Sequence, residues 1–182
     1  EGIDRVNEIL LRAYSPLRAE GRALFAGLKG LQMPTTAIGK LWRMTDALRE
    51  YRGDSHIAAW ISHGLDAVEL CLLTDAFSGL PLRTYSATRG WRDTDFDPAT
   101  ERLIAKGLLD AKSGTYTAAG RKRREIIEVH TDEQTLPAIA AIGDDYDELC
   151  SLLAPWGAAI KAVGGYPKMG PHEMALAAAK SA

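Results

Sequence analysis

The sequence predicts a mostly α-helical fold that contains one short β-hairpin. Apolar residues recur at helical spacing through most of the chain. Between residues 81 and 124 the pattern indicates a short helix, a turn, a second helix that ends in Gly107, a tight hairpin and a third helix. This order is typical of a winged helix-turn-helix, so we expect a short two-stranded wing embedded in a helical domain.

Helices are expected to fill the chain before the hairpin. Arg52-Gly53-Asp54 should interrupt them, with Asp54 or Ser55 as the N-cap of the helix that follows. Asp66 should start the next helix, because Gly64 ends the previous one. The expected ranges are 2–14, 16–28, 35–51, 56–64 and 66–79.

The hairpin and the helices after it have their own signals. The turn is expected at Lys112-Ser113-Gly114, where Gly114 supplies the positive φ. Thr117 can then cap a helix over residues 118–129. A looser stretch around Leu136-Pro137 is expected to separate it from a closing helix over 144–163.

These elements predict three parts of the chain. Residues 1–51 form a helical N-terminal arm, and because the chain starts with Glu rather than Met, we expect it to be a fragment or a processed product. Residues 52–165 form the winged-helix domain with its closing helix. Residues 166–182 form a C-terminal tail, which is ordered only if it docks.

Basic charge is concentrated in the predicted winged segment. The whole chain has 22 Lys and Arg against 24 Asp and Glu, a net charge of −2, which argues against a generally cationic nucleic-acid binder. Residues 81–124 hold ten Lys and Arg against five Asp and Glu, or +5, which leaves −7 for the remainder. A phosphate footprint would produce such an excess, and so would chance clustering on a solvated helix face.

Six basic residues around the helix-turn-helix and the hairpin are the candidate DNA contacts. Phosphate contacts by Lys and Arg would make affinity depend on salt. The second helix opposes this function, because Asp93, Asp95 and Asp97 stand at the base-reading end of a recognition helix and repel phosphate. The candidate DNA-binding residues are Arg83, Arg89, Arg92, Lys112, Arg121 and Lys122.

A second set of residues is compatible with a small-molecule site. Asp54 and His56 flank an expected helix N-terminus, where the dipole favours anions, and Arg89 could bind a carboxylate or phosphate in a bidentate manner. The structural alternative is an N-cap, a packed His, an Arg–Asp pair and a Trp that fills the core. The candidate ligand-binding residues are Arg52, Asp54, His56, Arg89, Trp91 and Asp132.

The motif search favours neither an enzyme nor a membrane protein. No Gly-rich phosphate loop, nucleophile elbow, HExxH or CxxC pattern is present, so no catalytic motif, cofactor or metal is expected. Cys71 and Cys150 lie in apolar helical patterns, which predicts buried reduced thiols in a cytoplasmic protein. No run approaches the roughly 18 apolar residues that span a bilayer.

Several strings along the chain resemble those of a known family. They are ALREYRGDSHIAAWISHGLDAVE, ATRGW, ERLIAKGLLDA, YTAAGRKRREIIEVHTD and LPAIAAIGDD. Together they resemble an actinobacterial family of MarR-like winged-helix proteins of unassigned biochemical role, over about residues 21–165. The resemblance implies a winged-helix fold, and it implies that the arm over residues 1–51 is part of a longer N-terminal helical region. The family's signature positions fall on Arg52, Gly53, Asp54, His56, Arg89, Gly90, Trp91, Thr131 and Asp132. The chain departs from the family at Leu136-Pro137-Ala138-Ile139, where Pro-Trp would precede the alanines.

These observations predict a MarR-like winged-helix protein that binds DNA as a transcriptional regulator in the cytoplasm. The alternative is a winged-helix scaffold that has lost DNA binding and serves as a small-molecule-binding or enzymatic protein, which the acidic helix favours. DNA and a small molecule are therefore the candidate partners. A homodimer through the terminal helices is the third expected interaction.

Overall fold

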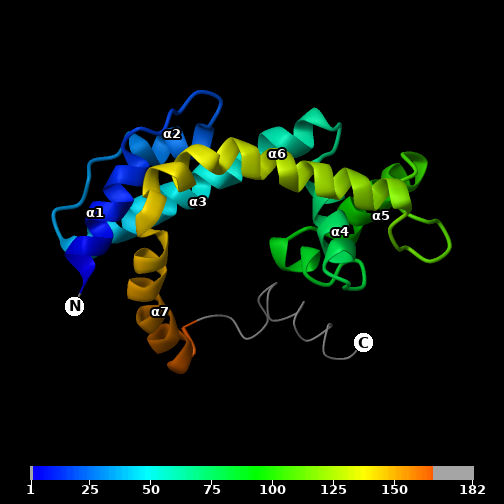
Figure 1. The fold of residues 1–182 in the computed structure, drawn as a ribbon. Coiled ribbons are helices and arrows are strands. Elements are labelled where there is room, and N and C mark those ends of the chain that lie inside the picture. Colours follow the sequence, from blue (N-terminus) through cyan, green and yellow to red (C-terminus); the bar gives the residue numbers. More distant parts are fainter. Residues whose placement is uncertain (1, 166–182) are drawn as a thin grey trace. The chain divides into compact units, whose positions relative to one another are not determined.

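The computed structural model describes residues 2–165, which form helices joined by loops (Figure 1). The elements are α1 (Ile3–Tyr14), α2 (Ala23–Lys29), α3 (Ala37–Ser62), α4 (Ala67–Phe77), the 3₁₀ helix η1 (Ser86–Arg89), α5 (Asp93–Ala105), α6 (Ala118–Ile142), the 3₁₀ helix η2 (Gly143–Asp145) and α7 (Tyr146–Ala162). The predicted tail, residues 166–182, lies outside the described residues. The mostly helical prediction is confirmed.

The described residues pack into two compact units. Unit 1 comprises the residues up to Ala58 together with Val129–Gly165, and unit 2 comprises Ala59–Glu128. The chain passes between the units inside α3 and inside α6. The division of the chain into domains at residues 1–51 and 52–165 stays a prediction.

Unit 1 has its own apolar core, built from α1, α2, α7 and the adjoining parts of α3 and α6. Phe25 of α2 is fully buried and packs edge-to-face on Tyr51 of α3, with 5.0 Å between ring centroids. Arg5 of α1 pairs with Glu148 of α7 at 2.7 Å. The residues buried in this core include Val6, Ile9, Leu10, Met44, Ala47, Ala138, Ile142 and Leu149.

Unit 2 has a second core, which α4, α5 and the first half of α6 share with the turn between α5 and α6. The apolar side of each helix faces this core, since burial of apolar area is the main term that stabilises such a small unit. The buried residues include Leu72, Leu73, Phe96, Ala99, Leu103, Leu108 and Ile127.

Local signals in the sequence are confirmed at several element ends. The first helix was expected over residues 2–14, and α1 spans Ile3–Tyr14. Asp66 caps α4 with its side chain, in a capping box. Gly114 has a φ of 65° in the turn before α6, and the Thr117 hydroxyl accepts a hydrogen bond from the Gly120 amide at 3.0 Å.

The predicted break at Arg52-Gly53-Asp54 is wrong, because α3 continues through it to Ser62. Asp54 is buried, and its carboxylate accepts a hydrogen bond from the Phe25 backbone amide at 2.9 Å. Phe25 is the third residue of α2, so Asp54 caps that helix and not its own. Burial of the Tyr51 ring, together with the hydrogen bonds of the buried Asp54 and Ser55 side chains, offsets the cost of about 1 kcal/mol that Gly53 imposes on a helix interior.

The predicted boundaries of two further helices are also wrong. The second helix was expected over residues 16–28, but α2 is only Ala23–Lys29. The loose stretch expected around Leu136-Pro137 is helical, since α6 runs through Pro137 to Ile142. Ala138 and Ile142 are buried in the core of unit 1, and their burial offsets the backbone hydrogen bond that a proline removes.

The prediction of a two-stranded wing is wrong, because no strand forms among the described residues. A single antiparallel bridge joins Leu109 to Tyr116, flanked by a hydrogen bond from the Asp110 amide to the Thr115 carbonyl at 2.9 Å. Each arm of the hairpin is too short to extend this ladder before α6 begins. We refer to residues 108–117 as the wing turn.

The two cysteines differ in exposure. Both are free; Cys71 is half-buried, and burial raises the pKa of its thiol. Cys150 is exposed on α7, so the prediction that both thiols are buried is wrong for Cys150. The adjacent Leu149 is the residue that is buried in the core of unit 1.

Candidate nucleic-acid interface

The carboxylate of Asp75 organises the loop that leads from α4 into η1. Asp75 lies in the last turn of α4 and is fully buried. Its Oδ1 accepts hydrogen bonds from the backbone amides of Tyr85 and Ser86 at 2.9 and 3.2 Å. Its Oδ2 accepts from the Arg83 amide at 2.9 Å and from the Ser86 hydroxyl at 2.5 Å. Four donors on one buried carboxylate therefore hold residues 83–86 and the start of η1.

Arg83 connects this loop to α5. Its backbone has a φ of 69°, in the left-handed region that non-glycine residues rarely adopt, and its amide donates to Asp75. The guanidinium reaches Asp97 at 2.5 Å and Asp93 at 3.4 Å. It also lies over the Phe96 ring, 5.6 Å from the centroid. Arg83 therefore offsets part of the negative charge at the start of α5.

α5 presents an acidic face to solvent. Asp93, Asp97 and Glu101 lie four residues apart on the side opposite the core, and all three are exposed. We call these three residues the acidic stripe. Asp95 has a different role, since its carboxylate accepts a hydrogen bond from the Arg92 amide at 2.9 Å. That bond lowers the pKa of Asp95 below its ordinary value and satisfies a free amide at the helix start.

Glu69 joins the end of α5 to the start of α4. It is 1% exposed, and Lys106 pairs with its carboxylate at 2.7 Å. Arg102 lies 3.3 Å from Glu69 and 2.6 Å from Asp66. Arg102 in the last turn of α5 and Lys106 just after it are therefore held by carboxylates at the start of α4.

The wing turn is built around Asp110. Its carboxylate accepts hydrogen bonds from the amides of Lys112 and Ser113 at 3.0 and 2.8 Å, and these bonds lower the pKa of Asp110. The Tyr116 hydroxyl donates to the Leu73 carbonyl of α4, and burial raises the pKa of Tyr116. These contacts fix the turn on unit 2, while Lys112 at its tip is exposed.

The basic run at the start of α6 divides into two pairs. Arg123 donates to the His63 carbonyl at 2.9 Å. Arg124 is buried, where it pairs with Glu128 and lies over the Phe77 ring at 5.1 Å from the centroid. The other pair, Arg121 and Lys122, is exposed. Half of this run thus contributes to packing and half remains at the surface.

Five of the six candidate DNA-binding residues are exposed, and four of these five form what we call the exposed cation set. The two residues outside the set are held by the helix-turn-helix: Arg83 pairs with α5, and Arg89 donates to the Tyr85 hydroxyl and stacks on that ring at 4.8 Å. Within the set, Arg92 lies 3.4 Å from Asp95, and Arg121 lies over the Tyr116 ring at 5.9 Å from its centroid. The exposed cation set is Arg92, Lys112, Arg121 and Lys122.

In unit 1, the candidate ligand-binding residues make structural contacts. His56 Nδ1 and the buried Thr131 hydroxyl are 2.9 Å apart. Arg52 lies 3.6 Å from Asp132, and both side chains are about half exposed or more. Asp54 caps α2 as described above. Each of these contacts fits the structural alternative.

In unit 2, Trp91 packs against the apolar core, as expected of a core-filling side chain. Among residues 2–165, no group of three or more His, Cys, Asp or Glu side chains is arranged to hold a metal ion. Within the same residues no single helix is long and apolar enough to cross a membrane, although α3 and α4 pass that test together as a pair bent by 101°.

Sequence reasoning missed the two buried carboxylates that assemble unit 2. Glu69 stands three residues after Asp66, which is the spacing of a capping box and could have indicated its role. Asp75 has a weaker signal, namely a charged residue inside an otherwise apolar helix pattern. A buried charge needs several partners, and those of Asp75 lie 8–11 residues further along the chain.

η1, the turn after it and α5 form a helix-turn-helix, backed by α4 and followed by the wing turn and α6. The chain belongs to a helix-turn-helix family, whose model matches residues 1–167. The match covers more than nine-tenths of the 182 residues. No curated protein and no solved structure is significantly similar to the chain.

Proposed function

We propose that the chain is a DNA-binding transcriptional regulator with a MarR-like helix-turn-helix. The observation that carries this proposal is the exposed cation set on a helix-turn-helix unit. These four residues come from the turn before α5, the tip of the wing turn and the start of α6. Winged helix-turn-helix proteins contact the phosphate backbone with the same elements.

The position of Arg121 and Lys122 supports a role outside folding. Both lie in the first turns of α6, where the helix dipole disfavours positive charge. They are also adjacent to Arg123 and Arg124, which adds like-charge repulsion. A bound phosphate backbone would relieve both costs, since it would supply the missing negative charge.

Arg83 and Arg89 have a positioning role in this proposal. Arg83 joins the loop after α4 to the start of α5, and Arg89 stacks on Tyr85 next to η1. Both residues would set the orientation of the helix-turn-helix, and the exposed part of Arg89 could also reach a phosphate.

Salt dependence tests the proposal. We expect the chain to bind duplex DNA of mixed sequence at low salt, with log K falling linearly with log salt concentration. Lys112→Ala and Lys122→Ala should each reduce the magnitude of that slope by about 0.9, because each removes one phosphate contact. Fluorescence anisotropy of a labelled duplex over a salt series measures the slope.

Lys161→Ala is the matched control for the salt series. Lys161 is exposed on α7 in unit 1 and carries the same charge, so its removal should leave the slope unchanged. Absence of binding at low salt, or slopes that are equal in all four proteins, would contradict the DNA-binding proposal.

The acidic stripe favours a second candidate function, a helix-turn-helix scaffold that has lost DNA binding and holds a small molecule. Three exposed carboxylates on the helix that would enter the groove repel phosphate. If α5 does face DNA, Asp97→Asn should strengthen non-specific binding by roughly two- to fivefold at low salt, because one repulsive charge is removed while Arg83 keeps its contact with Asp93.

Asp147→Asn on α7 provides the matched control for this substitution, since Asp147 is exposed and lies in unit 1. The same anisotropy assay compares both variants with the parent chain. Equal affinities for the Asp97→Asn variant and the parent would mean that α5 does not approach DNA, and the scaffold function would then be preferred.

A further inference from the structure

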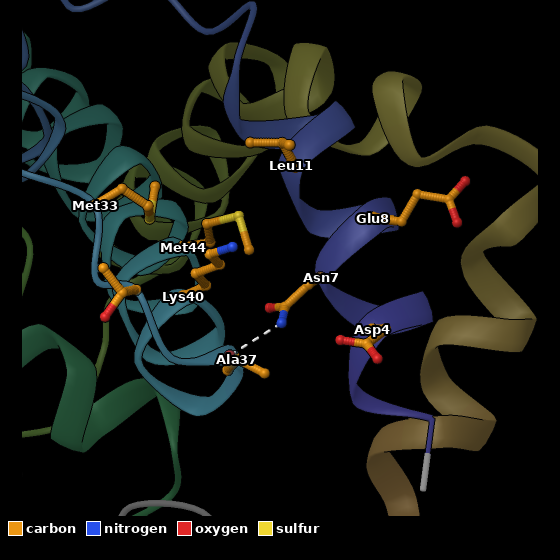
Figure 2. A pocket seen from close by; sticks show the side chains of 9 residues that line it. Asp4, Asn7, Glu8, Leu11, Met33, Ala37, Lys40 and Met44 are labelled. Carbon is orange, nitrogen blue, oxygen red and sulfur yellow. Dashed lines mark hydrogen bonds between the residues drawn. The ribbon is translucent and has the colours of Figure 1, made fainter.

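Unit 1 contains a cavity of about 620 Å³ between α1, the first turns of α3 and the loop that joins α2 to α3. Figure 2 shows the side chains that line it. A volume of this size is within the range of pockets that hold small organic ligands. Its lining residues are Asp4, Asn7, Glu8, Leu11, Met33, Thr35, Ala37, Lys40 and Met44.

The orientation of the Asn7 amide leaves a buried acceptor at this cavity. Asn7 Nδ2 donates to the Ala37 carbonyl at 2.9 Å, and a carbonyl can only accept, so this bond fixes which amide atom is the oxygen. Asn7 Oδ1 is buried and has no hydrogen-bond partner among the described residues. A buried acceptor without a donor is costly, so a ligand N–H that reached it would be stabilised.

The positive and negative groups at the cavity lie on different helices. Lys40 projects from α3, is exposed, and forms no ion pair with any residue in 2–165. Asp4 lies one turn before Asn7 on α1 and is also exposed. Glu8 pairs with Arg5 at 2.9 Å, and in Figure 2 its carboxylate points away from Lys40. One cation on α3 and one carboxylate on α1 therefore remain for a ligand.

The remaining wall of the cavity is apolar. Met33, Met44 and Leu11 face it from the loop, from α3 and from α1 (Figure 2). Met side chains adapt to the shape of a bound apolar group. Leu11 is 50% exposed without a ligand, so an apolar group placed against it would remove that surface from water.

We propose that this cavity binds a zwitterionic amino acid with a large apolar side chain. Lys40 pairs with the ligand carboxylate, while Asp4 and Asn7 Oδ1 accept hydrogen bonds from its ammonium group. The apolar side chain lies against the two methionines and Leu11. This ligand uses the Lys40, Asp4 and Asn7 groups and the apolar wall of the cavity, and the site is separate from the helix-turn-helix residues of the proposed function.

Four probes that differ by one feature test this assignment by isothermal titration calorimetry. L-Phenylalanine carries the carboxylate, the ammonium group and the apolar body. Phenethylamine lacks the carboxylate, 3-phenylpropanoate lacks the ammonium group, and L-alanine lacks the apolar body. We expect L-phenylalanine to bind, and each of the other three to bind at least about tenfold more weakly, because each leaves one interaction unmade.

Two substitutions separate the two charged contacts. Lys40→Gln should weaken the binding of L-phenylalanine by about tenfold or more and leave the affinity for phenethylamine unchanged, because only the carboxylate contact is lost. Asp4→Asn should weaken the binding of L-phenylalanine and of phenethylamine but leave the affinity for 3-phenylpropanoate unchanged. Lys161→Gln and Asp147→Asn, both on α7, are the charge-matched controls and should bind as the parent does. No binding of L-phenylalanine at millimolar concentration, or equal losses in the control variants, would overturn the proposal.

Discussion

Replacing Asp75 with Asn is expected to lower the free energy of unfolding by about 3 kcal/mol or more. The buried carboxylate accepts four hydrogen bonds, two at each oxygen. An Asn amide has only one oxygen, and its NH₂ group would face the donors on the other side. Two donors would then lose their acceptor in a buried site, which is the costly arrangement. Urea unfolding followed by circular dichroism measures the change.

Two further variants are the controls for Asp75→Asn. Ser86→Ala removes only the hydroxyl donor and should cost about 1 kcal/mol. Asp144→Asn changes an exposed carboxylate in η2 and should be nearly neutral. If Asp75→Asn lowered stability by no more than Ser86→Ala does, the carboxylate would not be the group that holds this loop.

Gly120→Ala should destabilise the chain by about 3 kcal/mol, although alanine is the better helix former. A Cβ atom at Gly120 would lie 2.0 Å from the Leu108 carbonyl oxygen and 2.9 Å from Tyr116 Cδ1. The first contact is with backbone, so the start of α6 and the wing turn must move apart. The hydrogen bond from the Thr117 amide to the Leu108 carbonyl, at 3.2 Å, lies in the same place.

Gly157→Ala is the matched control for this steric effect. Gly157 is inside α7, and a Cβ atom there would meet nothing within 4 Å. We expect that variant to be more stable than the parent by about 0.5–1 kcal/mol, from helix propensity alone. The same urea unfolding measurement compares both variants. A neutral or stabilising Gly120→Ala would show that the wing turn is not packed against α6 as described.

Predictions that depended on a few neighbouring residues were mostly confirmed. The helix start at Asp66, the Thr117 cap and the positive φ at Gly114 each depend on atoms within three residues. The amphipathic period of α1 is likewise a local property. Such signals act over one helical turn, so they can be recognised without knowing how the chain packs.

Predictions that treated Gly and Pro as breaks failed where the helix is buried. α3 continues through Gly53 and α6 continues through Pro137. In both cases a nearby residue is buried in the core of unit 1, namely Tyr51 before Gly53 and Ala138 after Pro137. Burial of apolar area there offsets the local backbone cost, and that burial depends on residues far away in the sequence.

The sequence by itself determined that this protein is mostly helical, where several of its helices begin, and that basic charge gathers in residues 81–124. Only the tertiary structure decided which of those charges remain at the surface. It places Arg124 in the interior and ties Arg102 and Lys106 to Glu69, while Lys112 and Lys122 stay exposed. Ion pairs between residues that are distant in the sequence form only when packing brings the two side chains together. The sequence therefore shows how many charged residues a segment has, but not which residue each of them pairs with.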